Sequence, residues 1–466
     1  MINTVADKIR PRVIGAIVAT GLMSFCGVIV ETAMNITFPT LMREFNITTN
    51  EVQWLTTLYL LVVASMVPLS ATLKRRFRTR SLFLVAITLF IIGIILDGIA
   101  PSFAVLLLGR GIQGLGTGVA LPLMFNIILE QVPRSKVGTM MGVGTLITGV
   151  APAIGPTFGG LIVSTLNWRY IFAILLPLLI FALILGLFCI EQKQAPEPAN
   201  IDAPSVVTIV ITFCGLIYGL SNIGNVAFAS WPVAGVMAVG VIALLVFVWR
   251  SHQLEHPLIR LGLFKQPLFT ISLLSFACLQ IIALALSFVL PNYIQLVNGN
   301  TALLAGLVVL PGAAIGAIMA PIGGRLLDHN GPKLPLRLGS IISLVGVGGM
   351  LLSATGLTNS RIVVLYILVM IGIGISMGNL MTTGLQQIAS TTQTDGNAIF
   401  NTAQQFTAAV GTSMASALVA AGQSSAHNLA HGTVLGTTHA LLAVVIIALV
   451  EILLVWLLTA RVRRHQ

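Results

Sequence analysis

Charged side chains are scarce in this sequence: they make up 8% of its 466 residues, while hydrophobic residues make up 56% and the mean hydropathy is +1.01. A soluble domain carries about 25% charged residues, most of them on its water-facing surface. So few charges could not cover such a surface. We therefore exclude a soluble enzyme and expect lipid to be the solvent for most of the chain.

Residues that carry catalytic or metal chemistry are sparse as well. The cysteines lie in or beside apolar runs without paired spacing, which disfavours disulfides and metal clusters; they are Cys26, Cys189, Cys214 and Cys278. His427 and His431 stand four residues apart but lack further metal ligands. The phosphate loop G-x-x-x-x-G-K-S/T does not occur, nor does a nucleophile–base pair, which disfavours an ATP-driven pump and a membrane-embedded enzyme. We expect no cofactor and no metal.

Long apolar runs dominate instead. Each has about 18 to 27 residues, enough to cross a ~30 Å hydrocarbon core as a helix. A membrane β-barrel would need alternating segments of about 10 residues, so the runs predict an all-α polytopic membrane protein. The fourteen expected spans are 13–37, 51–73, 80–98, 103–128, 137–163, 168–190, 205–224, 229–250, 268–293, 302–324, 335–355, 361–385, 399–422 and 438–460. Residues 203–250 could be divided differently, so the count stays open by two.

Basic residues are distributed unevenly between the loops. If the N-terminus is cytoplasmic, outside loops hold only Arg43, Arg169 and Arg361, and Arg110 lies within a span, so 20 of the 24 Lys and Arg residues fall inside. This asymmetry is the positive-inside rule, which predicts that both termini are cytoplasmic. A basic inner surface facing anionic lipid explains the net charge of +11 without nucleic acid. The first apolar run is too long for a signal peptide, so we expect it to be the first span.

The spans are grouped as six, two and six. We expect an N-terminal six-helix bundle at 1–190, a cytoplasmic linker at 191–204, two extra transmembrane helices at 205–250, a cytoplasmic segment at 251–267 and a C-terminal six-helix bundle at 268–466. Basic loops follow the second helix of each bundle, at residues 73–80 and 324–333. Repeated signals at equivalent places in two halves are typical of a duplicated transporter.

At these loops the chain resembles the fourteen-spanner drug:proton antiporters of the major facilitator superfamily, a group that includes multidrug efflux and lincomycin-resistance proteins. Residues 324–333 match the superfamily's G-x-L-x-D-x-x-G-x-K loop at every fixed position, with Gly324, Asp328, Gly331 and Lys333. In the first copy Arg76 and Arg80 fit, but Ala71, Arg75 and Arg78 replace the usual Gly, Asp and Gly. The resemblance implies that these loops form a gate, although the departures leave the role of the first copy open.

Three further motifs carry the resemblance. Arg110 to Gly114 fits the R-x-x-Q-G pattern of the fourth span, and residues 168–172 fit W-R-x-x-F. The glycine-proline motif that marks antiporters in the fifth span is matched by Gly149, Gly155, Pro156, Gly159 and Gly160. The resemblance implies a smooth, kinked hinge in the fifth span, while plain tight packing would require the same residues.

Glu31 is the acidic residue that we expect to work inside the membrane. A charge in the bilayer costs about 2.5 kcal/mol or more, so such a residue usually faces a cavity. Polar or small residues recur with it at helical spacing, which predicts a cavity-facing stripe of Thr20, Ser24, Gly27, Glu31 and Asn35. The family's first-span motif D-x-T-x-x-N-x-x-x-P is matched at Thr32, Asn35 and Pro39, but its acid is shifted by one residue from Val30 to Glu31.

Arg110 is the expected partner of Glu31. Each lies about seven residues inside the outer end of its span, or roughly 10 Å deep, so the two could meet. Contact with Arg110 would favour the charged Glu31, and burial would favour the protonated form. We interpret the pair as the proton-coupling site, in which protonation and substrate binding exclude each other. The alternative is a permanent structural ion pair.

Further polar and aromatic residues could line the substrate cavity, although each could equally be core packing. These are Tyr59, Gln113, Asn126, Gln280, Asn379, Asn401, Gln404 and Gln405, with Phe25 and Phe125. Asp328 is expected to anchor neighbouring helix ends, or else to be a solvated loop charge. Glu451 could be a second proton site or a structural partner in the last span.

The sequence therefore predicts a cell-membrane exporter of amphipathic, drug-like compounds, driven by proton entry. Its partners would be a small substrate, protons and lipid, and we expect a monomer that confers antibiotic resistance. Export of an endogenous lipid or metabolite is the alternative. A non-transporting sensor is disfavoured because the cytoplasmic segments are too short for a signalling domain.

Overall fold

The structure is a computed structural model and describes residues 8–192, 202–222, 230–254, 257–426 and 428–462. The side chains of residues 49, 50, 153, 156, 221 and 302 are also left outside the description. Within these ranges the chain is helical and without strands, which confirms the predicted fold class. The long helices are α1 Pro11–Phe45, α2 Thr49–Arg76, α3 Thr79–Gly98, α4 Phe103–Gln131, α5 Val137–Thr165, α6 Tyr170–Cys189, α7 Ala203–Ser221, α8 Val236–Gln253, α9 Pro267–Leu296, α10 Ala302–Asn330, α11 Lys333–Leu352, α12 Asn359–Gln386, α13 Gln393–Ser424 and α14 Leu429–Val462.

Among the described helices, 13 are long and apolar enough to cross a membrane. The exception among the fourteen is α13, whose polar residues lower its hydropathy although it is 32 residues long. Several helices outlast the apolar runs that predicted them. The first span, expected to end at 37, continues to Phe45, where Asn46 in the left-handed conformation (φ 53°) closes the helix. Hydropathy reports the part of a helix that lies in lipid, whereas backbone hydrogen bonding continues beyond it.

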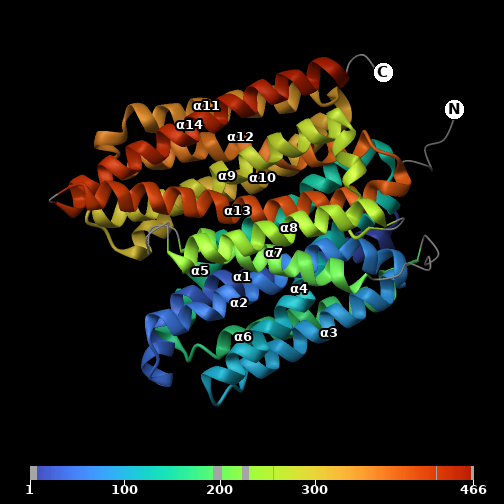
Figure 1. The fold of residues 1–466 in the computed structure, drawn as a ribbon, viewed down its shortest axis with the longest axis horizontal. Coiled ribbons are helices and arrows are strands. Elements are labelled where there is room, and N and C mark those ends of the chain that lie inside the picture. Colours follow the sequence, from blue (N-terminus) through green and yellow to red (C-terminus); the bar gives the residue numbers. More distant parts are fainter. Residues whose placement is uncertain (1–7, 193–201, 223–229, 255–256, 427, 463–466) are drawn as a thin grey trace.

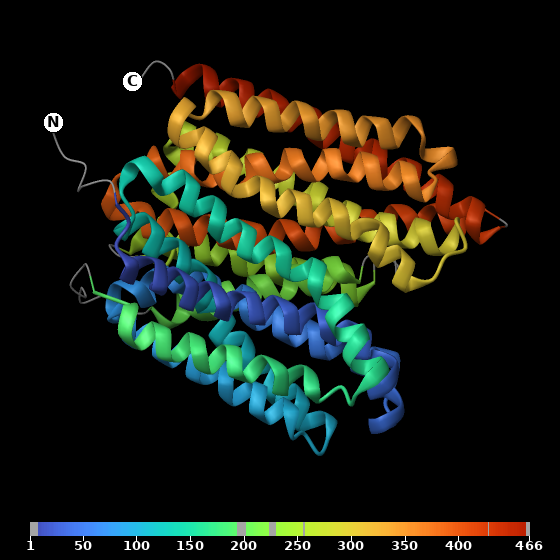
Figure 2. The ribbon, with the colours of Figure 1, turned by 180° about the vertical axis from the view of Figure 1, so that it is seen from behind.

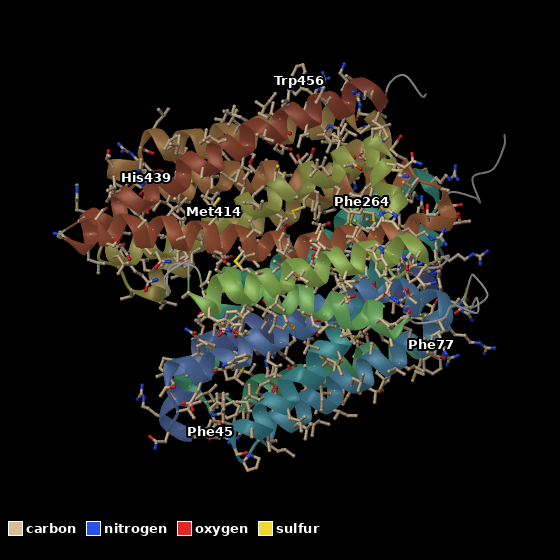
Figure 3. The ribbon with its side chains drawn as sticks, viewed as in Figure 1. Phe45, Phe77, Phe264, Met414, His439 and Trp456 are labelled. Carbon is tan, nitrogen blue, oxygen red and sulfur yellow. The ribbon has the colours of Figure 1, made fainter. Side chains whose placement is uncertain are left out.

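The first residues of α1 and the last residues of α14 lie at one end of the molecule, which we call the terminal end; the opposite end is the far end (Figures 1 and 2). Helix α1 runs from the terminal end to Phe45 at the far end, and α2 returns to Phe77 (Figure 3). In the last helix, α14, His439 lies nearer the far end and Trp456 nearer the terminal end (Figure 3). The long helices therefore run roughly parallel to one axis, as expected for a membrane bundle.

The helices pack as two bundles. In the first, α1 packs against α4, α5 and α6, and α3 packs against α4 and α6. In the second, α9 packs against α12, α13 and α14, and α11 packs against α12 and α14. The bundles meet along two lines, where α5 faces α10 and where α2 and α4 face α13. We call these the α5–α10 seam and the α2–α13 seam.

Helices α7 and α8 pack against each other as a separate pair. Their glycines allow a close approach, since a Cβ on Gly215 would come within 2.8 Å of the Gly240 Cα. At the start of α7 the Asp202 carboxylate accepts two hydrogen bonds from Arg250, at 2.6 and 2.7 Å, and this holds the pKa of that carboxyl well below its usual range. Helix α7 also packs against both α2 and α13, so the pair covers the α2–α13 seam (Figure 1). Of the expected linker 191–204, residues 193–201 lie outside the described residues.

Candidate functional site

A cavity of about 380 Å³ lies between the two bundles. Helices α1, α2, α4 and α5 form one wall, and α9, α10, α12 and α13 form the other. Neutral polar groups and large apolar side chains alternate over its surface, and Glu31 is the one charged residue among its described lining residues. A cavity of this kind suits an amphipathic molecule with at most a small positive charge.

Several predicted cavity residues line this space. From the first bundle these are Ser24, Glu31, Tyr59, Phe125 and the motif glycine Gly149, and from the second they are Gln280, Gln404 and Gln405. The structure adds lining residues that the sequence did not single out; most of them are apolar, and they include Met370, Met377, Met381, Phe276 and Tyr366. These have ordinary core character in the sequence, so only the fold reveals that they face a cavity.

The remaining predicted cavity residues do not line this cavity, and each makes contacts elsewhere. Gly27 packs against Thr117 and the Tyr59 hydroxyl. Asn35 accepts a hydrogen bond from the Thr56 hydroxyl at 2.7 Å, and the Asn379 amide donates to the Ile375 carbonyl of its own helix at 2.7 Å. Thr20 donates to the Ala16 carbonyl, and Phe25 packs on the hydrophobic core.

Asn126 and Asn401 belong to a buried asparagine chain between the bundles. The Asn397 amide of α13 donates to the Asn126 side-chain oxygen at 2.7 Å and to the Pro122 carbonyl at 2.8 Å, both on α4. The Asn401 amide in turn donates to the Asn397 side-chain oxygen at 2.7 Å. Asn126 and Asn401 therefore help to join the two bundles rather than lining the cavity, whereas Gln404 and Gln405 of the same helix line it.

Arg110 is fully buried in α4 and is held from three sides. Its Nη1 donates to Gln113 Oε1 at 2.7 Å and its Nε donates to the Leu55 carbonyl at 3.3 Å. Its guanidinium carbon lies 4.1 Å from the centre of the Tyr59 ring, a cation–π contact. The Tyr59 hydroxyl is fixed in turn by the Gly27 carbonyl and the Thr117 hydroxyl, each at 3.1 Å.

Glu31 lies farther from the end of its helix than the sequence suggested. Because α1 continues to Phe45, Glu31 is fourteen residues from its far end, about 20 Å along the axis, whereas Arg110 is seven residues inside α4, which begins at Phe103. The two side chains still attract each other electrostatically. No ion pair joins them within the residues that the structure describes.

Asp97 completes this group and was missed in the sequence. Asp97, at the end of α3, is a second acid in the first six spans and is fully buried. Its Oδ2 accepts a hydrogen bond from Gln113 Nε2 at 2.6 Å, so Gln113 bridges Arg110 to Asp97 instead of lining the cavity. The sequence signal for Asp97 is Gln113 of the R-x-x-Q-G motif. Its amide can accept a hydrogen bond from Arg110 and at the same time donate one to a second residue.

The glycine motif of α5 faces α1. A Cβ on Gly155 would come within 2.8 Å of the Thr32 Cβ, and one on Gly159 within 2.8 Å of the Ala33 carbonyl oxygen. Gly160 is less confined, since its nearest neighbour would be Ile36 at 4.0 Å. The side chain of Pro156 lies outside the described residues. The motif thus packs α5 tightly on α1, as both the hinge and the packing interpretations require.

At the terminal end, Asp328 of α10 caps the start of α5. Its carboxylate accepts hydrogen bonds from the Gly138 and Thr139 backbone N–H groups at 2.8 and 2.7 Å, and from the Thr139 hydroxyl at 2.6 Å. The first N–H groups of a helix lack intrahelical partners and favour an anion. The second loop therefore ties the two bundles together. Gly324 packs on Gly138, Gly331 ends α10 with a positive φ of 70°, and Lys333 begins α11.

The first loop also joins the two bundles, but here the residue that it contributes is basic instead of acidic. Arg75 of α2, which stands where the family usually has Asp, forms an ion pair with Asp395 in the first turn of α13. Arg260 reaches the same buried carboxylate at 3.0 Å. Arg75 thus joins the two bundles through Asp395, although it replaces the acidic residue that is usual in the first copy of the loop. Arg76 and Arg80 of this loop are exposed to solvent.

Glu451 and the W-R-x-x-F motif have structural partners away from the cavity. Glu451 of α14 is buried and accepts a hydrogen bond from the Ser340 hydroxyl of α11 at 3.0 Å. In the W-R-x-x-F motif, Trp168 Nε1 and Arg169 Nη1 each donate to the Glu44 carboxylate at 2.6 Å, which fastens α1 to α6 at the far end. Of the two histidines four residues apart that were disfavoured as a metal site, His427 lies outside the described residues. Among the described residues, no cluster of His, Cys, Asp and Glu has metal-binding geometry.

Known proteins resemble the chain over nearly its whole length. The sequence pattern of the Major Facilitator Superfamily matches residues 20–412. Lincomycin resistance protein LmrB of Listeria monocytogenes is 38% identical over 430 residues, which cover 92% of this chain and 91% of that protein. LmrB of Bacillus subtilis is 39% identical over 459 residues (96% and 95%), and multidrug resistance protein Stp of Mycobacterium tuberculosis is 26% identical over 332 residues (71% and 62%).

Solved structures share the fold. The human organic anion transporter MFSD10 (TETRAN) superimposes with a TM-score of 0.65 at 12% identity, covering 96% of this chain and all of that one. The proton:xylose symporter XylE has the same TM-score at 14% identity, covering 96% and 94%. From the sequence match, the relatives and the two-bundle architecture together, we conclude that this multi-pass membrane protein is a transporter and not an enzyme, and that it belongs to the major facilitator superfamily.

Proposed function

We propose that the protein exports amphipathic, drug-like compounds from the cytoplasm in exchange for protons. The observation that carries the proposal is Glu31, the one charged group among the described cavity-lining residues, placed within the electrostatic reach of Arg110 without an ion pair to it. Such a carboxyl can hold either a proton or a cationic substrate. Because the two compete for one group, proton arrival favours substrate release.

The terminal end faces the cytoplasm in this proposal, as the basic loops predict. The described hydrogen bonds and ion pairs between the bundles gather at that end, at Asp328, at Arg75 with Asp395, and in the asparagine chain. The ribbons of the two bundles diverge toward the far end (Figure 1). This arrangement supports an outward-facing state, from which a proton reaches Glu31 and a substrate leaves.

Proton entry supplies enough energy for such export. One charge moved through the membrane potential is worth about 2.3 kcal/mol per 100 mV, which corresponds to roughly fifty-fold accumulation. The two bundles would then rock against each other, breaking the ties at the terminal end and forming new contacts at the far end. Asp328 and Arg75 would act as gate residues in this cycle.

The substrate class follows from the cavity and the relatives. Methionine and aromatic side chains adapt to different apolar shapes, and the glutamines and hydroxyls offer neutral hydrogen bonds. The relatives named for lincomycin and multidrug resistance support a drug as substrate. Export of an endogenous lipid or metabolite is the second candidate, favoured by the largely neutral cavity wall.

Efflux from intact cells tests the proposal. Cells that express the wild type should lose loaded lincomycin or a fluorescent cation such as ethidium, and a proton uncoupler should stop the loss. Glu31→Gln should abolish proton-driven export, while Glu451→Gln, at a buried acid away from the cavity, should retain it. Export that resists the uncoupler in the wild type, or full proton-driven export by Glu31→Gln, would contradict the proposal. Substrate-stimulated proton flux in proteoliposomes, measured across drugs and lipids, separates the two substrate classes.

A further inference from the structure

Three ionisable side chains from three helices meet inside the first bundle. Glu31 comes from α1, Asp97 from α3 and Arg110 from α4, and Arg110 interacts electrostatically with both acids. Arg110 and Asp97 are fully buried, and Asp97 lies outside the cavity lining. The group thus has two carboxyls and a single guanidinium, with one carboxyl facing the cavity and the other behind the wall.

Gln113 links Arg110 to Asp97, the carboxyl that lies outside the cavity lining. Its amide oxygen accepts from Arg110 Nη1 at 2.7 Å, so its NH₂ group is left to donate, which it does to Asp97 Oδ2 at 2.6 Å. Close helix packing holds this bridge in place: a Cβ on Gly109 would overlap the Asp97 carboxylate, and one on Gly93 would overlap Gln113. Glu31 has no comparable link to Arg110 among the described contacts.

The other charges near this group are already neutralised. Arg169 donates to the Ala100 carbonyl close to Asp97, but its charge is paired with Glu44. Lys74 and Glu130, on α2 and α4, pair with each other at 2.9 Å. Of the helices packed around Asp97, α2 contributes Tyr59, whose hydroxyl oxygen lies 3.1 Å from both the Gly27 carbonyl and the Thr117 hydroxyl. Helix α6 contributes Tyr170, which is exposed, and Cys189, which packs on Gly15. The net charge of this buried region therefore depends on Glu31, Asp97 and Arg110.

Charge neutrality then fixes the number of protons in the group. An uncompensated charge is expensive to bury, and the usual relief is to bind or release a proton. With both carboxyls ionised the group carries one negative charge, and with both protonated it carries one positive charge. One bound proton makes it neutral. A cationic substrate beside Glu31 neutralises the group equally well, so it can replace that proton.

We propose that Asp97 is the positioning residue that makes Glu31 exchange protons. Through Gln113 it offsets the charge of Arg110, which would otherwise hold Glu31 permanently ionised. The group of three side chains is then neutral only when Glu31 holds a proton or lies beside a cationic substrate. This requirement couples proton binding to substrate binding. The inference deepens the proposed function and rests on it.

Replacing Asp97 by Asn tests this role. Asn keeps the oxygen that accepts from Gln113 but removes the negative charge, so Arg110 becomes available to Glu31. Purified protein binding ethidium or lincomycin should be measured by calorimetry in two buffers of different ionisation enthalpy, which gives the number of protons released. The wild type should release about one proton per cation bound near neutral pH. Asp97→Asn should release almost none, and its pH midpoint for binding should fall by about one to three units.

Matched variants separate this role from a structural one. Glu451→Gln removes another buried acid, one that does not line the cavity, and should leave proton release and the pH midpoint unchanged. Gln113→Leu keeps both acids but breaks the bridge. It should shift the midpoint in the same direction as Asp97→Asn, and it provides the test if Asp97→Asn does not accumulate in the membrane. A structural defect alone would lower the amount of folded protein without moving the midpoint.

The outcomes distinguish the two proposals. If wild-type export resists an uncoupler, the proposed function fails. If the wild type is proton-coupled, but Asp97→Asn and Gln113→Leu release protons and bind with the wild-type midpoint, the role of Asp97 is overturned while the proposed function stands.

Discussion

Neutralising Asp328 should open the terminal end of the cavity. In the wild type its carboxylate accepts three hydrogen bonds from the first turn of α5, at 2.6 to 2.8 Å. Hydrogen bonds to a charged group contribute about 1.5–3 kcal/mol each. Asp328→Asn loses the charge and turns an NH₂ group toward backbone N–H donors. We therefore expect the closed state to lose about 2–4 kcal/mol, which is a shift of roughly 30- to 700-fold toward the open state.

A matched variant gives a graded control. Thr139→Val removes only the hydroxyl that donates to Asp328 at 2.6 Å and keeps both backbone bonds. We take about 1.5 kcal/mol for this one bond, the lower end of the range for a charged acceptor, because the carboxylate keeps two other donors, so the expected shift is about ten-fold. The order of effects should therefore be Asp328→Asn, then Thr139→Val, then wild type.

Cysteine labelling can measure this shift. Ala320 lines the cavity and lies at the α5–α10 seam, where a Cβ on Gly142 would meet its carbonyl. In a background with the four native cysteines replaced, Ala320→Cys should react with an impermeant maleimide added from the cytoplasmic side at a rate proportional to the open fraction. Equal labelling rates in Asp328→Asn and its parent would refute the gate that we derive from the cap.

Two further predictions concern other parts of the molecule. Gly155→Ala should impair transport without preventing membrane insertion, because its Cβ would push against Thr32, whereas Gly160→Ala has room and should transport normally; equal transport by both would contradict the tight α1–α5 contact. Asp202→Asn should leave the pH profile of transport unchanged between about pH 5 and 8, because Arg250 holds the pKa of Asp202 below its usual ~3.9. The stabilisation from this pair is lost only when the pH falls through that lowered value, so a changed profile would show that our assignment of its charge state is wrong.

Hydropathy predicted the helices well because the bilayer requires every span to be apolar and internally hydrogen-bonded. It located helix ends poorly. Helix α1 continues past its apolar run to Phe45, and this moved Glu31 from an expected depth of about 10 Å to about 20 Å from the helix end. Helix α13 begins at Gln393 rather than 399, because its polar first turns face the other bundle instead of lipid.

The candidate site was only partly predictable from sequence, because periodicity shows which residues share a face but not which helix lies opposite. Ser24 and Glu31 could be placed on a cavity from their spacing in one helix. The burial of Asp97 could not be predicted from spacing in its own helix, since it depends on the approach of α3 to α4 at Gly93 and Gly109. The link between Arg75 and Asp395 joins residues 320 positions apart, so a motif comparison alone showed only the loss of an acid.

The α7–α8 pair makes the two sides of the transporter unequal toward the membrane. Helix α7 lies against both α2 and α13, so it covers the α2–α13 seam, while α5 and α10 meet on the opposite face (Figures 1 and 2). Lipid molecules therefore border the line between the bundles at the α5–α10 seam, whereas protein borders it at the other. A hydrophobic compound that enters sideways from the bilayer would pass between α5 and α10, beside the small residues Gly142 and Ala320.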